Sequence, residues 1–232
     1  MAFTPALIVV DMQNDFCVEL KNAPLFVSGA LDTLPVINKL LASDKFVFKV
    51  ATKDWHPQSH VSFASNHSGE SPFTSFVTIK NLVANKPEET MEQRLWPDHC
   101  VQKTKGAELV EGLDVSKVDL IVEKGQDERV EMYSAVSDSF GNQTHGKGGV
   151  SHDLAQLLKD KDVTHVYTVG IAGDYCLNYT ALDSAKSGFT TYVIEEAQRC
   201  VDPGAWAAVC EGFKTGKVKL IAEDSEEVEK VL

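Results

Sequence analysis

The chain has 232 residues, 43% of them hydrophobic, so it is long enough to bury the core of one sizeable domain. Its 34 acidic residues outnumber 22 basic ones, and a formal charge of -12 argues against partners such as nucleic acid or an anionic membrane. Five cysteines without regular spacing disfavour a disulfide scaffold and favour a reducing compartment.

The expected location is the cytoplasm. An apolar run over 6–10 follows the first residues almost directly, which leaves no room for a secretion signal. No apolar stretch reaches the length of a membrane span, and the last three residues match no common retention or peroxisomal signal. Association with the nucleus or the peroxisome stays open.

Short apolar runs rich in strand-forming residues alternate along the chain with longer helical patterns. Strands are expected at 6–10, 46–52, 120–123, 166–170, 191–194 and 218–222. Helices are expected at 31–42, 107–113, 152–159, 175–187 and 203–212, and in a charged tail from residue 225. This order predicts one α/β domain over 1–232, with a six-stranded, mostly parallel, Rossmann-like sheet between two helical layers.

Two polar segments interrupt the alternation. Residues 57–93 are rich in Ser, His, Asn and Pro, and we expect loops with little regular structure there. Residues 141–149 are rich in glycine and predict a surface loop. Neither segment has the character of a domain boundary.

The expected strands end in residues with catalytic chemistry. Asp11 follows the first strand, Lys124 follows the third, and the turn after the fourth leads to Cys176 at the start of a helix. The carboxyl ends of parallel strands meet at one edge, where ligands bind. There a carboxylate can accept a thiol proton while an ammonium stabilises the negative charge. Each residue alone has an ordinary structural explanation, but together they predict a nucleophilic site.

The remaining cysteines lack such a position. A helix N-terminus favours a thiolate, and Cys176 lies in the first turn of its predicted helix. We expect the others to be structural thiols: Cys17, Cys100, Cys200 and Cys210.

A metal site is suggested by Asp54 and His56, whose spacing places both side chains on one side of an extended segment. His99 offers a third ligand, and one Asp with two His suits a divalent ion, zinc first, with manganese or iron as alternatives. His60 and His67 are rival ligands in the same region.

Five segments, ALIVVDMQNDF, TKDWHP, WPDHCVQ, EKG and GIAGDYC, occur in the order seen in nicotinamidases of the isochorismatase-like cysteine hydrolase superfamily. The resemblance spans Ala6 to about Ile194. It implies hydrolysis of nicotinamide to nicotinate and ammonia through a thioester, as in NAD salvage, with pyrazinamide as a further substrate. It implies the catalytic residues Asp11, Lys124 and Cys176 and the metal ligands Asp54, His56 and His99.

The resemblance also implies an oxyanion hole beside the nucleophile. It places a cis peptide between Ile171 and Ala172, and the amides of Ala172 and Cys176 as the two donors. In the segment after Lys124 the chain departs from the family, because Glu131 and Val136 stand where relatives carry Asp and Phe.

Four aromatic residues lie beside the motifs, and a pyridine ring needs flat apolar walls. We expect a substrate-binding role for Phe16, Trp96, Tyr133 and Tyr175, the first two above the others, with plain core packing as the alternative.

Three other interpretations compete with this one: another amidase of this fold whose substrate has no pyridine ring, an isochorismatase, or a protein that keeps the hydrolase fold but serves as a scaffold or metal-binding partner. Metal content and ammonia release separate them. The expected partner is the small-molecule substrate, and a homo-oligomer stays open.

Overall fold

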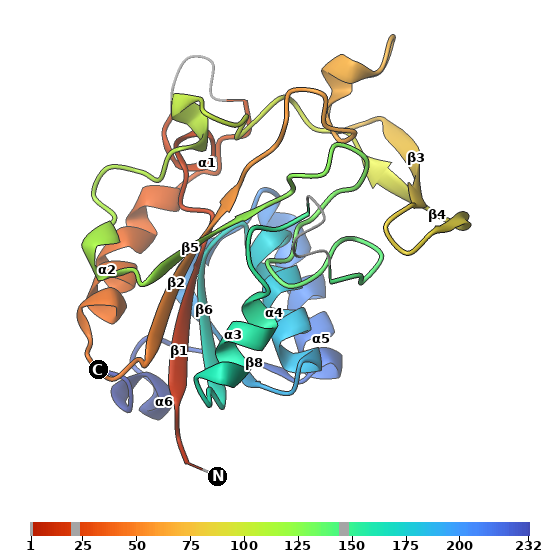
Figure 1. The fold of residues 1–232 in the computed structure, drawn as a ribbon. Coiled ribbons are helices and arrows are strands. Elements are labelled where there is room, and N and C mark those ends of the chain that lie inside the picture. The colour runs from red at the N-terminus through yellow and green to blue at the C-terminus, as the bar shows by residue number, and fades with distance from the viewer. Residues whose placement is uncertain (1, 20–23, 144–148) are drawn as a thin grey trace.

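The computed structural model describes residues 2–19, 24–143 and 149–232 (Figure 1). Its centre is a six-stranded sheet in the order β5-β2-β1-β6-β7-β8, and each neighbouring pair is parallel. The fold-class prediction is therefore confirmed. The strands are β1 (Pro5–Val10), β2 (Phe48–Asp54), β5 (Leu120–Lys124), β6 (His165–Ile171), β7 (Thr190–Arg199) and β8 (Val218–Ile221).

Helices cover both faces of this sheet (Figure 1). On one face lie α2 (Leu34–Ala42) and α6 (Glu226–Glu229), and on the other α3 (Leu154–Asp160), α4 (Cys176–Lys186) and α5 (Trp206–Gly216). The continuous apolar run of β1 follows from this arrangement, because Leu7 faces one helical layer while Ile8 faces the other. No helix among the described residues is long and apolar enough to cross a membrane.

Short helical pieces complete the fold. One turn of α-helix follows β1, and single 3-10 turns begin or interrupt several connections. They are α1 (Asn14–Cys17), η1 (Ala30–Thr33), η2 (Ala64–Asn66), η3 (Lys105–Ala107), η4 (Val115–Lys117) and η5 (Pro203–Ala205).

The helix predicted at 107–113 is wrong. Only the 3-10 turn η3 forms there, and the chain then runs extended beside the segment after β1. Leu109 pairs with Gln13 in an isolated bridge, and the amide of Val110 donates to the carbonyl of Met12 at 2.9 Å. These tertiary hydrogen bonds replace the bonds that a helix would have made within itself.

The prediction of loops over 57–93 is wrong for its second half. Strands β3 (Phe76–Asn81) and β4 (Lys86–Arg94) form an antiparallel hairpin that projects from the main body (Figure 1). Most of its side chains are exposed or polar, and the apolar alternation is limited to Val77 and Ile79 of β3, which is too short to mark a strand pair. Of the glycine-rich segment 141–149, residues 144–148 lie outside the described part of the chain.

The sheet order determines where the site forms. Strands β5, β2, β1 and β6 are direct neighbours, so their carboxyl ends lie side by side. The chain leaves the centre in opposite directions from β1, toward β2 and toward β6, which is the reversal point where open α/β sheets bind ligands.

Candidate active site

Three buried side chains meet at these strand ends. Asp11 follows β1 with a φ of 46°, Lys124 is the last residue of β5, and Cys176 begins α4. The Lys124 Nζ lies 2.9 Å from Asp11 Oδ2 and 3.3 Å from Cys176 Sγ. The Cys176 sulfur and one carboxylate oxygen of Asp11 lie within 4.8 Å of each other. The structure thus brings together the carboxylate, ammonium and thiol that the sequence suggested.

Neighbouring groups fix this trio. The hydroxyl of Thr52 donates to Asp11 Oδ1 at 2.6 Å and accepts from the Asp11 amide at 3.2 Å. Lys124 also donates to Asp54 Oδ1 and, at 3.4 Å, to the carbonyl of Met132. The lysine therefore links two carboxylates and the sulfur with no exposed surface of its own.

Burial sets the protonation of the trio. It raises the pKa of the Cys176 thiol well above the usual range, and the Lys124 charge only partly opposes this. It raises the pKa of Asp11 in the same way, again against the pull of Lys124. For Lys124, burial would lower the pKa, but the two carboxylates raise it well above its usual value. The resting site therefore holds a neutral thiol and a fixed cation.

The turn before Cys176 is held by the segment that follows the neighbouring strand β7. This turn contains a cis peptide between Ile171 and Ala172. The Asp174 carboxylate accepts hydrogen bonds from the amides of Val201 at 2.9 Å and Asp202 at 2.8 Å. Asp174 was not singled out from the sequence, although the motif GIAGDYC contains it.

Two amides in this turn are available to a ligand. The Cys176 amide is the first of its helix, so it has no partner within that helix. The amide of Ala172 donates to no backbone carbonyl among the described residues of the turn. Both belong to the segment that carries the thiol, so a group bonded to Sγ would lie near them.

Asp54, His56 and His99 form a cluster suited to a metal ion. Their ligand atoms lie within 4.8 Å of one another, and all three side chains are buried. The Nε2 atoms of both histidines are 3.7 Å from Asp54 Oδ2. Burial opposes ionisation of Asp54, but Lys124 and His56 hold the pKa of this carboxyl well below its usual range.

Hydrogen bonds behind the histidines aim them at the cluster. The Nδ1 of His56 lies 2.9 Å from the Gly125 carbonyl, and the Nδ1 of His99 lies 2.8 Å from the Pro97 carbonyl. Each Nδ1 then carries the proton, which leaves the Nε2 lone pair free for a cation. The Nε2 of His56 is buried without a hydrogen-bond partner, as expected of a ligand atom. These residues fit a divalent ion.

Glycine is required beside His56. Gly125 has a φ of +68°, and a Cβ there would lie 2.4 Å from the imidazole Cε1 of His56. A side chain would displace the ring that its own carbonyl orients. The EKG motif therefore supplies both the Lys124 ammonium and, through Gly125, the space that the His56 ring occupies.

Glu131 completes the charge balance of the site. Its Oε1 lies 4.0 Å from His56 Nε2, and its Oε2 is buried without a hydrogen-bond partner. Asp11, Asp54 and Glu131 bring three carboxylates against the single ammonium of Lys124. The site is therefore rich in negative charge, and Asp54 and Glu131 raise the pKa of His56 against the effect of burial. A divalent cation would supply compensating positive charge there.

The two rival histidines are engaged elsewhere. The His60 ring nitrogens lie 2.8 Å from Ser62 Oγ and 3.3 Å from the Val130 carbonyl. Burial lowers the pKa of His60 to about 3, so it is neutral. The Nε2 of His67 lies 2.8 Å from the Val61 carbonyl. His60 forms a second cluster with His56 and Glu131, whereas His67 belongs to neither.

An apolar cavity opens above the sulfur. The four aromatic residues singled out from the sequence all line it. The rings of Trp96 and Tyr175 meet edge to face with centroids 4.9 Å apart, and Phe16 packs against His99 at 5.5 Å. Val136, in contrast, does not line this cavity. The lining residues are Phe16, Leu25, Asp54, Trp96, His99, Glu131, Tyr133, Ala172, Tyr175, Cys176 and Val201.

The hairpin supplies a contact that the sequence did not reveal. Gln93 of β4 is buried and donates to the Tyr133 hydroxyl at 2.7 Å, and the Trp96 indole donates to the same oxygen at 2.9 Å. The segment was expected to be loop, so nothing in it marked Gln93. This network fixes two aromatic walls of the cavity relative to each other.

Comparisons with known proteins agree with this geometry. The family model described as Isochorismatase domain matches residues 5–223. The nicotinamidase of Acinetobacter baylyi is 41% identical over 197 residues, which cover 85% of this chain and 82% of that protein.

Two solved structures are similar over nearly the full chain. The yeast nicotinamidase bound to the inhibitor nicotinaldehyde has a TM-score of 0.84 at 32% identity, with 94% of this chain and 100% of that chain covered. The pyrazinamidase of Pyrococcus horikoshii in complex with zinc has a TM-score of 0.66 at 31% identity, covering 94% and 98%. The chain therefore belongs to the isochorismatase family.

Proposed function

We propose that this chain is a metal-dependent nicotinamidase, which hydrolyses nicotinamide to nicotinate and ammonia. The observation that carries the proposal is one buried juxtaposition. Cys176 Sγ lies 3.3 Å from Lys124 Nζ, at the wall of an aromatic cavity that the metal-type ligands Asp54 and His99 also line. A thiol beside a base attacks a carboxamide, and a flat cavity with a cation at its edge selects a ring that carries a nitrogen.

The first half of the reaction forms a thioester. Asp11 accepts the Cys176 proton, and its raised pKa makes it a better base than an exposed aspartate. The sulfur attacks the carboxamide carbon while Lys124 balances the negative charge. The oxyanion accepts hydrogen bonds from the amides of Ala172 and Cys176, and one such donor is worth about 3 kcal/mol of barrier. Asp11 then protonates the departing ammonia.

The second half hydrolyses the thioester. With ammonia gone, Asp11 is again a carboxylate and takes a proton from the attacking water. The same two amides hold the second oxyanion, because the reacting carbon has not moved from the sulfur. Collapse breaks the carbon–sulfur bond, Asp11 returns its proton to the thiolate, and nicotinic acid leaves and loses its proton to water to give nicotinate.

Asp54, His56 and His99 would hold the metal ion, zinc by the chemistry of the donor set. When bound, the ion supplies a Lewis-acid contact for the pyridine nitrogen, which orients the ring. The aromatic walls, Phe16 and Trp96 among them, fix the ring plane so that the carboxamide carbon faces Sγ. Pyrazinamide keeps the ring shape and this nitrogen, so we infer that it is a second substrate.

Ammonia release tests this function. Zinc-loaded protein is given nicotinamide, pyrazinamide or benzamide, the last of which lacks the ring nitrogen. We expect ammonia from the first two, little from benzamide, and loss of all activity on chelation with recovery on adding zinc. Absence of ammonia from nicotinamide would refute the proposal, and equal rates with benzamide would refute the role given to the ring nitrogen.

A further inference from the structure

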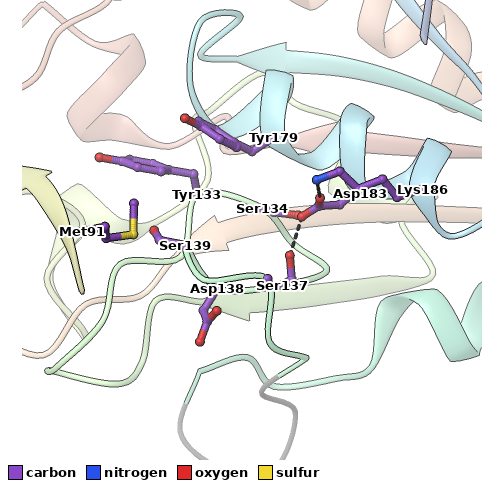
Figure 2. A pocket seen from close by; sticks show the side chains of 10 residues that line it. Met91, Tyr133, Ser134, Ser137, Asp138, Ser139, Tyr179, Asp183 and Lys186 are labelled. Atoms are coloured by element: carbon purple, nitrogen blue, oxygen red, sulfur yellow. Dashed lines mark hydrogen bonds and ion pairs between the residues drawn. The ribbon is translucent and has the colours of Figure 1, made fainter. Parts of the chain in front are cut away.

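A second pocket shares a wall with the active site. It lies between β4, the segment 133–141 and the outer face of α4, and its volume is about 130 Å³ (Figure 2). We call it the Tyr179 pocket, lined by Met91, Tyr133, Ser134, Tyr179, Asp183 and Lys186 among others. Tyr133 also lines the cavity above Cys176, so one side chain belongs to both spaces. The pocket has room for a molecule of one ring.

One end of the Tyr179 pocket is aromatic. The rings of Tyr133 and Tyr179 are nearly parallel, 20° apart in plane with centroids at 5.3 Å. Met91 lies beside them at the same end, whereas Asp183 and Lys186 lie at the other (Figure 2). Flat rings with a thioether form a surface on which a planar ring packs.

The other end offers hydrogen-bond donors. An ammonium has three N–H donors, and Lys186 uses one of them on Asp183 Oδ1 at 2.9 Å. Its side chain is 74% exposed, so the remaining donors are accessible. Ser134 Oγ accepts from the amide of Val136 at 3.1 Å, which leaves the hydroxyl hydrogen available.

Both carboxylates in the pocket already accept hydrogen bonds from the protein. The second oxygen of Asp183 accepts from the hydroxyl of Ser137. Asp138 is buried, and its Oδ1 accepts from the amides of Phe140 and Asn142, both at 2.9 Å. Free donors opposite satisfied carboxylates favour a ligand that brings acceptors of its own.

We propose that the Tyr179 pocket binds a small aromatic carboxylate, with its ring on Tyr179 and its carboxylate on Lys186. This chemical class includes the product of the proposed reaction, so the inference rests on that function for its biological meaning. The pocket is then a product site outside the catalytic cavity. A ligand seated there contacts the side chain that also borders the substrate.

Tyr133 provides the coupling between the two spaces. Its hydroxyl is held by Gln93 and Trp96, and Trp96 is itself a wall of the substrate cavity. A ring packed on the outer side contacts the same side chain that walls the substrate cavity, so its binding changes the fit of the substrate. A ligand bound in the Tyr179 pocket therefore inhibits the enzyme without occupying the Cys176 cavity. We expect inhibition by the product to have a noncompetitive component.

Binding of benzoate tests the pocket without turnover, because benzoate has neither an amide nor a ring nitrogen. Titration of the zinc-loaded protein with 4-fluorobenzoate is followed by fluorine NMR. We expect Lys186→Met and Tyr179→Ala each to weaken binding at least fivefold. Lys214→Met is the matched control, since Lys214 makes the same kind of exposed pair with a glutamate three residues earlier, on α5. This control variant is expected to bind like the wild type.

Kinetics supply the second measurement. Lys186→Met is expected to keep kcat and KM for nicotinamide within twofold, while the noncompetitive part of benzoate inhibition weakens at least fivefold. Unchanged binding in both pocket variants, or purely competitive inhibition of the wild type, would overturn the proposal. The two proposals can fail separately. If the chain were not a nicotinamidase, no ammonia would form from nicotinamide, but Lys186→Met would still weaken the binding of 4-fluorobenzoate.

Discussion

Two regions build the active site by different physical means. Asp11 and Lys124 lie at strand tips that the hydrogen-bond ladder of neighbouring strands places, and Cys176 begins α4 after the short turn that follows β6. The rim consists of the β3–β4 hairpin and the segment 126–139, and long-range side-chain hydrogen bonds tie it to the cavity. The catalytic residues therefore lie on rigid backbone, whereas the shape of the cavity depends on side-chain hydrogen bonds that a single substitution can remove. The two regions should respond to substitution by very different amounts.

Replacing the nucleophile should give the largest effect. Cys176→Ala removes the only sulfur in the buried trio, and we expect kcat/KM for nicotinamide to fall at least about 10⁴-fold. Cys210→Ala is the control, because this half-buried thiol lies on α5 outside the site. Ammonia release measures both variants. A Cys176→Ala enzyme with more than a hundredth of wild-type activity would contradict the thioester route.

Removing the ammonium should damage both stability and catalysis. In Lys124→Met, Asp11 and Asp54 lose the cation that links them, and breaking such a buried ion pair destabilises by about 3–5 kcal/mol. The metal-free protein should show this loss in urea unfolding, and kcat/KM should fall about 10³-fold. Lys49→Met is the comparison, since its buried Nζ donates to the carbonyl of Leu41. Equal losses in the two variants would mean that Lys124 acts only through packing.

The strand tips could be predicted from the sequence because one physical rule places them. Asp11 directly follows a buried apolar run, and Lys124 ends another. Once the strands are parallel and adjacent, their last residues must meet. The same rule places Cys176, since a short turn links β6 to α4. The alternation of strands and helices does not predict the strand order, because packing of the helices and strands sets it.

The rim could not be predicted because its signals are tertiary. The side chains of β4 are mostly exposed, and the buried face of β3 is short and includes the polar residue Asn81, so the sequence gives only a weak strand signal. Gln93 is an ordinary polar residue until it is buried against Tyr133, 40 positions away. Likewise Leu109 lies in a segment whose sequence predicts a helix, but in the fold it pairs with Gln13 in an isolated β-bridge. Glu131 was noted only as a departure from relatives, and its orphaned oxygen became visible with the fold.

Within the rim, Glu131 should have the largest effect because it faces the metal-type cluster. Glu131→Gln keeps the shape but removes one of the buried negative charges, so we expect zinc affinity to fall about 10- to 100-fold. Competition with a chromogenic chelator measures it. Glu128→Gln is the control, since this exposed carboxylate of the same segment accepts from Ser59. Unchanged zinc affinity in Glu131→Gln would remove the carboxylate from the metal site.

Gln93 tests whether the hairpin shapes the cavity. Gln93→Leu deletes the hydrogen bond to Tyr133 and should raise KM for nicotinamide about tenfold, the effect of about 1.4 kcal/mol, with a smaller change in kcat. Thr78→Val is the control, because it removes an exposed hydrogen bond to Glu92 elsewhere on the hairpin. If Gln93→Leu lowered kcat with KM unchanged, the residue would act on the transition state and not on the fit of the ring.

The smallest effect should come from a rim ion pair between a buried carboxylate and an exposed arginine. The side-chain hydrogen bond from Arg129 lowers the pKa of Asp127, at distances of 2.6 and 2.8 Å. Because the folded carboxyl is the stronger acid, its stabilisation is complete above the unfolded pKa of about 4 and is lost as the pH falls below it. Arg129 is 54% exposed, so the loss is screened and stays below about 1 kcal/mol. Urea unfolding at pH 3 and pH 6 should show a smaller pH dependence in Asp127→Asn than in the wild type. An identical dependence would mean that solvent screens this pair entirely, and that the rim depends on its buried hydrogen bonds alone.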